Sequence, residues 1–181
     1  MTCMARIQVL DKTFEPYIAA DAIDVEIKRM GEELSRDYAG KTPVFIAILN
    51  GSFMFASDLF KAITIPAEIC FVKLASYEGT SSTGKLVTAI GLTTDIRDRD
   101  VVILEDIIDT GMTLSKFIPE LEAKGPRSIR VCALLHKKEA TTHPVEISYL
   151  GFTIPDRFVL GYGLDYDGLG RNLKEIYQLV E

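Results

Sequence analysis

Residues 101–113 read VVILEDIIDTGMT. The first four of these residues are all apolar, which predicts a short strand that is buried on both faces. The residues from Thr113 to Lys124 predict a helix, so the sequence passes from a buried strand through a short loop into a helix. This succession indicates a parallel sheet whose ligands lie beyond the carboxyl ends of the strands.

The loop between this strand and helix has the features of a phosphate site. Gly111 permits a tight turn, and Thr110 and Thr113 supply hydroxyl groups. Backbone N–H groups at the start of a helix carry partial positive charge and bind anions. The loop is therefore predicted to hold a phosphate group.

Three carboxylates accompany this loop, at Glu105, Asp106 and Asp109. Carboxylates beside a bare phosphate would repel it, so they indicate additional ligands. They accept hydrogen bonds from neighbouring hydroxyls and hold hard cations such as Mg²⁺. A phosphorylated ribose accompanied by a metal ion would satisfy the whole set.

A simpler interpretation is that Asp109 or Thr110 caps the helix and that the earlier acids are solvated. That interpretation fits any one of these residues but explains their combination poorly. Adjacent residues of a strand point to opposite faces, so either Glu105 or Asp106 would enter a crevice or the core. Such burial costs free energy unless the carboxylate has a partner.

The remaining pattern alternates strands and helices, which predicts an α/β protein with a mostly parallel sheet flanked by helices. Residues 76–85 are rich in Gly, Ser and Thr and predict a mobile loop. We expect helices at 23–38, 52–63 and 113–124, and strands at 44–49, 68–74, 86–92, 101–104, 128–135, 145–150 and 158–162.

Composition limits the possible functions. With 181 residues, 48% of them hydrophobic, the chain suits a single domain, and a net charge of −6 argues against nucleic acid as a partner. Cys3, Cys70 and Cys132 are far apart, and with His136 and His143 they suggest neither a disulfide framework nor a zinc site. No apolar run approaches the roughly 18 residues of a membrane span. We therefore expect a soluble cytoplasmic protein without a membrane partner.

Residues 101–113 closely resemble the phosphoribosyl pyrophosphate signature of the type I phosphoribosyltransferases, and EDIIDTG resembles the hypoxanthine-guanine branch. Further matches occur in order at 49–52 (LNGS), 76–77 (SY), 134–137 (LLHK), 158–159 (FV) and 164–166 (LDY). The resemblance implies the type I phosphoribosyltransferase fold in one domain, residues 1–181. Its core would span about 40–140, and a small hood would combine about 1–20 with 145–181.

The resemblance also implies roles for the loop residues. Glu105 and Asp106 would bind the ribose hydroxyls with Mg²⁺ nearby. Asp109 would in addition take the proton from N7 of the base while N9 attacks the sugar, as a general base. The 5′-phosphate would be held by Asp109, Thr110, Gly111, Met112 and Thr113.

Purine recognition is implied at a second group of residues: Ile107, Lys137, Phe158, Val159 and Asp165. Lys137 would donate to O6 of a 6-oxopurine, Phe158 would stack on the ring and Val159 would offer backbone groups. Asp165 would lie near the exocyclic group and a possible second metal ion. Without the resemblance, Lys137 would be interpreted as a solvated lysine and Phe158 as a core residue.

Pyrophosphate binding is implied at Leu49, Asn50, Gly51 and Arg171, with Ser76 and Tyr77 as the signature of a closing loop. Arg171 could otherwise be an ordinary surface arginine. The family carries a cis peptide in the first of these segments, and we predict it between Leu49 and Asn50. Asn50 departs from the lysine that is frequent there, which puts the role of that lysine in subunit contacts or affinity in doubt.

The sequence thus predicts an enzyme of purine salvage. It would transfer the phosphoribosyl group of phosphoribosyl pyrophosphate to hypoxanthine, guanine or both, giving IMP or GMP, and would form a homodimer or homotetramer. Rival interpretations are an RNA-binding regulator with the same fold, a nucleotide-sensing module, and a xanthine or pyrimidine transferase. The negative net charge argues against the RNA-binding regulator. Asp109 and the closing loop argue against the nucleotide-sensing module, which would need neither. Lys137 together with Phe158-Val159 favours a 6-oxopurine over xanthine or a pyrimidine as the substrate.

Overall fold

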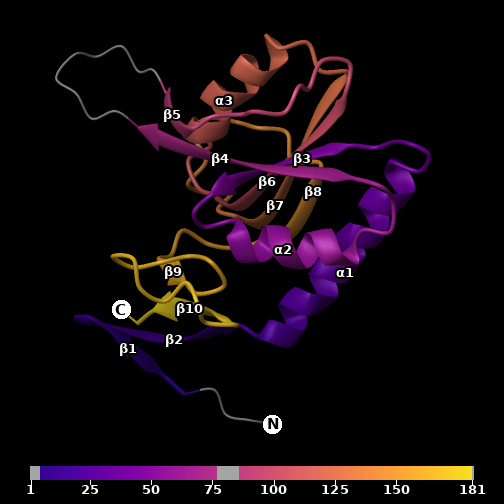
Figure 1. The fold of residues 1–181 in the computed structure, drawn as a ribbon. Helices are drawn as coiled ribbons and strands as arrows, with labels where there is room; N and C mark the ends of the chain where they lie inside the picture. Colours follow the sequence, from indigo (N-terminus) through magenta and orange to yellow (C-terminus); the bar gives the residue numbers. More distant parts are fainter. Residues whose placement is uncertain (1–4, 77–85, 181) are drawn as a thin grey trace, which may run out of the picture.

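A six-stranded sheet forms the centre of the molecule, in a computed structural model that describes residues 5–76 and 86–180. Its strand order is β5-β4-β3-β6-β7-β8, and five neighbouring strands are parallel while β5 pairs antiparallel with β4 (Figure 1). The strands are β3 (Val44–Leu49), β4 (Glu68–Ser76), β5 (Leu86–Ile90), β6 (Asp100–Ile108), β7 (Ser128–His136) and β8 (Tyr149–Thr153).

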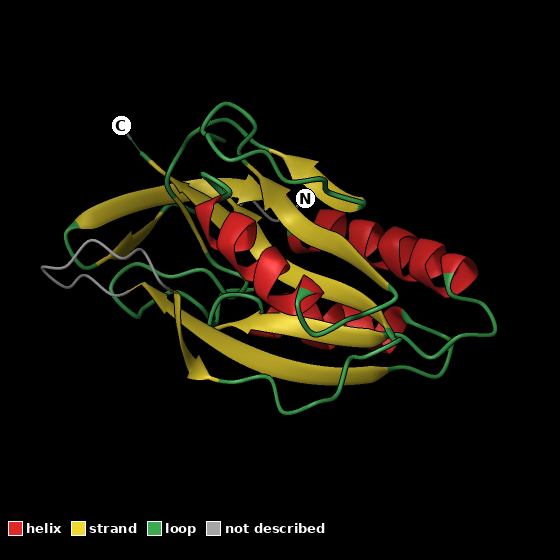
Figure 2. Ribbon diagram, turned by 90° about the horizontal axis from the view of Figure 1, so that it is seen from above, coloured by secondary structure: helices red, strands yellow, loops and turns green. Residues whose placement is uncertain are grey.

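Helices cover both faces of this sheet (Figure 2). On one face lie α1 (Ala20–Asp37) and α2 (Phe53–Ala62), whose apolar side chains form a core with Phe45, Val102 and Leu104. On the other face α3 (Met112–Glu122) packs its buried residues against a second core that includes Ile46 and Ile103. Because the central strands are buried on both faces, they are apolar almost throughout.

A second, smaller sheet lies beside α1 and α2 and combines the two ends of the chain (Figure 1). It consists of β1 (Ile7–Val9), β2 (Lys12–Ile18), β10 (Ile176–Leu179) and β9 (Val159–Leu160), in the antiparallel order β1-β2-β10-β9. Phe14, Leu160 and Tyr177 form its buried centre. This sheet is the hood expected from the sequence, and the predicted fold class is confirmed.

Several predicted strands differ from the structure: the strand expected at 86–92 ends at Ile90, and the one expected at 158–162 is only Val159–Leu160. The strand expected at 101–104 continues to Ile108, so Glu105 and Asp106 belong to the strand itself. The strand expected at 145–150 is wrong in position, because β8 begins only at Tyr149. Pairing with β7 starts there, where Tyr149 comes into register with Cys132, and the residues before it are partly exposed.

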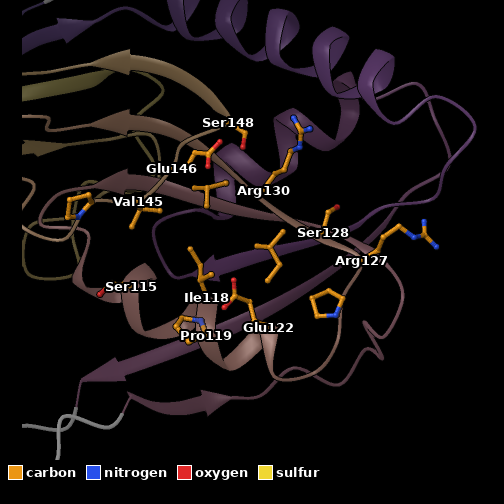
Figure 3. A pocket seen from close by; sticks show the side chains of 14 residues that line it. Ser115, Ile118, Pro119, Glu122, Arg127, Ser128, Arg130, Val145, Glu146 and Ser148 are labelled. Atoms are coloured by element: carbon orange, nitrogen blue, oxygen red, sulfur yellow. The ribbon is translucent and has the colours of Figure 1, made fainter.

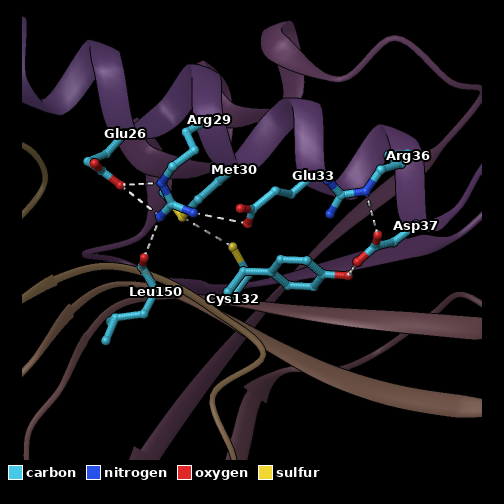
Figure 4. Close-up of polar contacts among 9 residues, drawn as sticks. Glu26, Arg29, Met30, Glu33, Arg36, Asp37, Cys132 and Leu150 are labelled. Carbon is cyan, nitrogen blue, oxygen red and sulfur yellow. Dashed lines mark hydrogen bonds and ion pairs between the residues drawn. The ribbon is translucent and has the colours of Figure 1, made fainter.

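Polar contacts tie α1 to the edge strand β8 (Figure 4). Arg29 donates to the carbonyl oxygen of Leu150 at 2.6 Å and forms ion pairs with Glu26 and Glu33 on its own helix. The hydroxyl of Tyr149 donates to Asp37 at 2.9 Å. A strand with only one neighbour is thereby held against the core.

The described helices include none with the length and apolar character that a membrane crossing requires.

Cys70 and Cys132 are both free thiols. Burial raises the pKa of the Cys132 thiol, which lies against the sulfur of Met30 in the core. Cys132 is therefore a packing residue in this fold.

Candidate active site

A cavity of about 320 Å³ lies where β6 and β7 end and the hood begins. Parallel strands end together at one edge, which is where ligands bind in such sheets. Nine of its ten lining residues were predicted from the sequence, and the tenth, Leu164, was not. The lining residues are Gly51, Asp106, Ile107, Asp109, Lys137, Phe158, Val159, Leu164, Asp165 and Arg171.

Glu105 and Asp106 point to opposite sides of the sheet. Glu105 is in register with Ala133, which belongs to the core on the α3 side, whereas Asp106 faces Gly51, just before α2. A Cβ atom at position 51 would overlap the Asp106 carboxylate, so a larger residue there would displace this side chain. The strand therefore presents its two carboxylates to different surroundings, and only Asp106 lines the cavity.

Both carboxylates have a raised pKa. Glu105 is 8% exposed, and burial followed by the charge of Asp106 raises its pKa well above the ordinary value. Burial raises the pKa of Asp106 to about 6, although backbone N–H groups and Arg171 act in the opposite direction. Within the described residues, Glu105 receives no hydrogen bond from another side chain. A cation or hydroxyl donor that reached these groups would relieve this cost.

The turn after β6 directs its carbonyl groups away from the site. Lys137 N–H donates to Ile108 O at 2.9 Å, and the Thr141 hydroxyl donates to Asp109 O at 3.0 Å. Thr110 O accepts from two further N–H groups, those of residues 142 and 143, at 3.1 and 2.9 Å. Because segment 137–143 takes up these acceptors, the turn is left with N–H groups to offer a ligand.

Gly111 closes this turn with a φ of +79° and leads directly into α3. Its conformation is one that side chains rarely adopt, and a Cβ atom there would overlap His143 O. Gly111, at the N-cap position of α3, has no side chain that could accept a hydrogen bond from the first turn. The described side-chain contact to an N–H group of this turn is a weak one, from Met112 N–H to the Thr110 hydroxyl at 3.3 Å. A tight glycine turn therefore leads into a helix whose first N–H groups have few side-chain partners among the described residues.

Lys137 lies at the end of β7 between two carboxylates. Its ammonium is 3.0 Å from Asp109 and 3.2 Å from Asp156, and the residue is only 8% exposed. Burial acts to lower the pKa of Lys137, but the hydrogen bonds that its ammonium donates to Asp109 and Asp156 outweigh burial, so the pKa is raised. The ammonium therefore stays charged and serves only as a donor. Asp156 was not predicted from the sequence, because its contact with Lys137 depends on how segment 154–158 returns to β7.

The hood closes the cavity from the other side. Arg171 donates to Gly163 O at 2.6 Å and pairs with Asp165 at 2.7 Å, and Asp165 also accepts from Gly168 N–H at 2.7 Å. Gly163 lies against the carbonyl of Gly51, so closely that a side chain would not fit. The predicted residues Asp165 and Arg171 are thus brought beside the segment that follows β3.

That segment contains the predicted cis peptide bond, between Leu49 and Asn50. Ser52 is fully buried and donates to Ile48 O at 2.5 Å, which closes the turn before α2. Leu49 and Asn50 lie beside the cavity lining but do not contribute to it, unlike Gly51.

Phe158 and Val159 approach the cavity from the hood. Phe158 is 43% exposed although it is a large aromatic residue, and its ring lies 5.8 Å from that of Tyr166 and 6.1 Å from that of Phe14. Val159 is buried at the start of β9. An exposed aromatic face at a cavity suits stacking on a flat ring.

The predicted metal ligands do not form one cluster. Asp106 and Asp165 line the same cavity, Glu105 does not, and the described residues hold no group of three metal-binding side chains. Of the predicted closing-loop residues, Ser76 ends β4 and Tyr77 lies outside the described residues. The described chain therefore offers single carboxylates that a metal ion could share with a ligand, which is how Mg²⁺ is commonly held at phosphate sites.

A larger cavity of about 720 Å³ lies between α3, the beginning of β7 and residues 144–148 (Figure 3). Figure 3 shows Ser115, Glu122 and Glu146 among its labelled lining residues. None of the predicted site residues lines it. It also lies along the first half of β7, away from the carboxyl ends of the strands, so the smaller cavity is the better candidate.

Residues 18–167 match the phosphoribosyl transferase domain, and the chain belongs to this family. Similar curated relatives specify the branch. The hypoxanthine-guanine phosphoribosyltransferase of Mycobacterium tuberculosis H37Rv is 42% identical over 88% of this chain and 82% of its own length. The hypoxanthine phosphoribosyltransferase of Buchnera aphidicola is 38% identical over 93% and 97%, respectively.

Solved structures agree with this assignment. A hypoxanthine phosphoribosyltransferase from Staphylococcus aureus superimposes with a TM-score of 0.87 at 40% identity and covers 92% of this chain and 91% of its own. A hypoxanthine-guanine phosphoribosyltransferase from Bacillus anthracis gives 0.87 at 34% identity, with 92% and 98% coverage. The family resemblance stated from the sequence is therefore confirmed.

Proposed function

We propose that this protein transfers the phosphoribosyl group of phosphoribosyl pyrophosphate to hypoxanthine or guanine, forming IMP or GMP in purine salvage. One observation carries the proposal. A single cavity brings together Asp109 from the turn after β6, Lys137 from the end of β7 and the hood residue Phe158. These are an acceptor, a donor and an aromatic face, which together suit a 6-oxopurine.

The sugar phosphate occupies the β6 side of the cavity. The N–H groups of residues 110–113 hold the 5′-phosphate, since segment 137–143 engages the carbonyl groups of the turn. Glu105 and Asp106 accept hydrogen bonds from the ribose hydroxyls. The Leu49–Gly51 segment and Arg171 bind the pyrophosphate, because a guanidinium matches an anion of high charge.

The base occupies the other side, against Phe158 and near Val159, Ile107 and Asp165. Lys137 donates to O6, and Asp109 accepts the proton from N7 as N9 attacks the anomeric carbon. The bond from that carbon to the pyrophosphate oxygen breaks in the same step. Positive charge develops on the sugar, as in glycoside chemistry, and the carboxylates of β6 lie beside it.

The donor set fits Mg²⁺, because Glu105, Asp106 and Asp165 supply hard oxygen ligands and a carboxylate with a raised pKa gains from a cation. These residues would hold it singly, with substrate oxygens completing the coordination. When bound, the ion neutralises negative charge on the pyrophosphate. A homodimer or homotetramer in the cytoplasm completes the proposal on the strength of the family resemblance, and sedimentation of the purified protein measures the oligomeric state.

The test is an assay with phosphoribosyl pyrophosphate and Mg²⁺ in which hypoxanthine, guanine, xanthine and uracil are offered separately. We expect nucleotide formation with hypoxanthine, guanine or both. Turnover with xanthine or uracil alone would move the protein to another transferase of this fold. No turnover with any base would favour an RNA-binding regulator, which a binding assay with RNA would then examine.

A further inference from the structure

Asp156 is the one partner of Lys137 that lies outside the cavity. The Lys137 ammonium reaches Asp109 at 3.0 Å and Asp156 at 3.2 Å, but only Asp109 lines the cavity. The Lys137 side chain is 10% exposed, whereas the Asp156 side chain is 61% exposed. One carboxylate therefore holds the ammonium from inside the site, and the other holds it from the rim.

The backbone fixes Asp156 in this position. Ile154 N–H donates to His136 O at 2.9 Å, which brings the chain back to β7 one residue before Lys137. Pro155 has a restricted φ, and the Pro155 carbonyl accepts from Arg157 N–H at 2.8 Å. Asp156 consequently follows a buried anchor, Ile154, by only two residues.

The same short segment leads to the cavity. Phe158 lies two residues after Asp156, and Val159 begins β9. The ion pair between Lys137 and Asp156 thus connects the end of β7 to the part of the hood that lines the site. An ammonium carries three protons, and two of them are used by the carboxylates. The third has no side-chain acceptor among the described residues.

We propose that Asp156 is a positioning residue that lets Lys137 turn from Asp109 to the exocyclic oxygen of a 6-oxopurine without losing its counter-ion. This inference rests on the proposed function. Entry of the base separates Lys137 from Asp109, whose carboxylate must be free to accept a proton. Asp156 keeps the ammonium charged and in place during this exchange.

Selectivity follows from the same arrangement. A charged ammonium can donate hydrogen bonds but cannot accept them. It therefore favours binding of a purine with an oxygen at position 6 over one with an amino group there. Without the second carboxylate, Asp109 becomes the sole counter-ion of a nearly buried charge. Base binding must then break that pair outright, which weakens the affinity for the base.

The test compares the steady-state kinetics of the whole protein and of Asp156→Asn with hypoxanthine or guanine. We expect KM for the base to rise about 10-fold, because a charged hydrogen bond is lost. The kcat and the KM for phosphoribosyl pyrophosphate should stay within about 3-fold, since Asp156 contacts neither the phosphate turn nor the pyrophosphate segment. Asp156→Glu should restore most of the affinity, because the exposed rim accommodates one more methylene group.

Glu139→Gln is the matched control, since this exposed carboxylate lies two residues from Lys137 and has no described ion pair with it. Its kinetics should equal those of the unchanged protein. An unchanged KM for the base in Asp156→Asn would overturn the inference, as would a general loss of stability and turnover that Asp156→Glu does not repair. A protein that fails to use any 6-oxopurine would instead overturn the proposed function.

Discussion

The two ends of strand β6 carry buried carboxylates in opposite states. At its beginning, Asp100 is 5% exposed and accepts from Ser128 Oγ at 2.7 Å and from Arg127 at 3.0 Å. Burial acts to raise the pKa of Asp100, but Ser128, Lys41 and Arg127 outweigh it, so the pKa is lowered. Near the other end, burial raises the pKa of Glu105 and Asp106.

We infer that this difference separates a structural carboxylate from the two carboxylates proposed to bind a ligand. Asp100 obtains its partners from the protein, so folding alone stabilises its charge. Glu105 has no such partner among the described residues, and the backbone N–H groups and Arg171 that act on Asp106 do not outweigh burial, so the charge of both costs free energy in the absence of a ligand. A fold keeps such groups where a cation or hydroxyl donor from outside supplies what is missing. Substitutions along β6 and its following turn test this contrast.

Asp109→Asn should have the largest effect. An amide has nearly the same shape as a carboxylate but cannot take a proton, so we expect kcat to fall roughly 10²- to 10⁴-fold. Thermal unfolding should change little, because the side chain is exposed at 48%. Single-turnover measurement of nucleotide formation checks the chemical step. Near-normal turnover would remove the general-base role and leave the fold assignment intact.

Asp100→Asn should show the reverse pattern. We expect the free energy of unfolding at neutral pH to fall by about 2–3 kcal/mol, since a buried and well-partnered charge is lost, and turnover to be retained. The lowered pKa stabilises the fold above the ordinary value of 3.8, and this contribution disappears as the pH falls through the lower folded value. Urea unfolding over that range should show the two proteins converging, and a difference that persists in acid would contradict this explanation.

The sequence predicted the parallel sheet better than the hood. Strand β3 matches its predicted bounds at both ends, because a strand buried on two faces is an uninterrupted apolar run. Strands β2 and β10 were not predicted individually. They are half-exposed, and they pair across most of the chain, with Phe14 opposite Leu179, so no local pattern marks them.

The site shows the same division. The turn after β6 could be predicted because strand, glycine and helix are consecutive in the sequence. Asp156 and Thr141 were missed, since each acts through a neighbour that is distant in the sequence and their residue types are common at surfaces. Leu164 was missed because a buried leucine has the pattern of an ordinary core residue. The raised pKa of Asp106 could not be predicted from the sequence either, because it depends on burial by the folded chain.

Asp106→Asn should stabilise the ligand-free protein. The folded pKa of about 6 lies above the ordinary 3.8, so the stability of the unchanged protein falls as the pH rises from 3.8 through about 6. An amide does not ionise, and the variant should therefore gain roughly 1–2 kcal/mol at neutral pH and nothing below 3.8. Turnover should fall, because the ribose hydroxyls lose an acceptor. Urea unfolding without Mg²⁺ or phosphoribosyl pyrophosphate measures the gain. A variant less stable than the parent at neutral pH would contradict the inference that the Asp106 charge costs free energy in the ligand-free protein.

Thr141→Val should have the smallest effect and addresses the turn itself. The Thr141 hydroxyl lies within 3.0 Å of Asp109 O and 3.1 Å of Lys137 O, so it joins the turn after β6 to the end of β7. Valine has nearly the same shape without this donor, and we expect a loss of about 1 kcal/mol in stability with a rise of a few fold in KM for phosphoribosyl pyrophosphate. Thr142→Val is the control, since the Thr142 hydroxyl contacts only His143 among the described residues while its N–H keeps the bond to Thr110 O. Equal effects of the two substitutions would mean that the backbone bonds alone orient the phosphate turn.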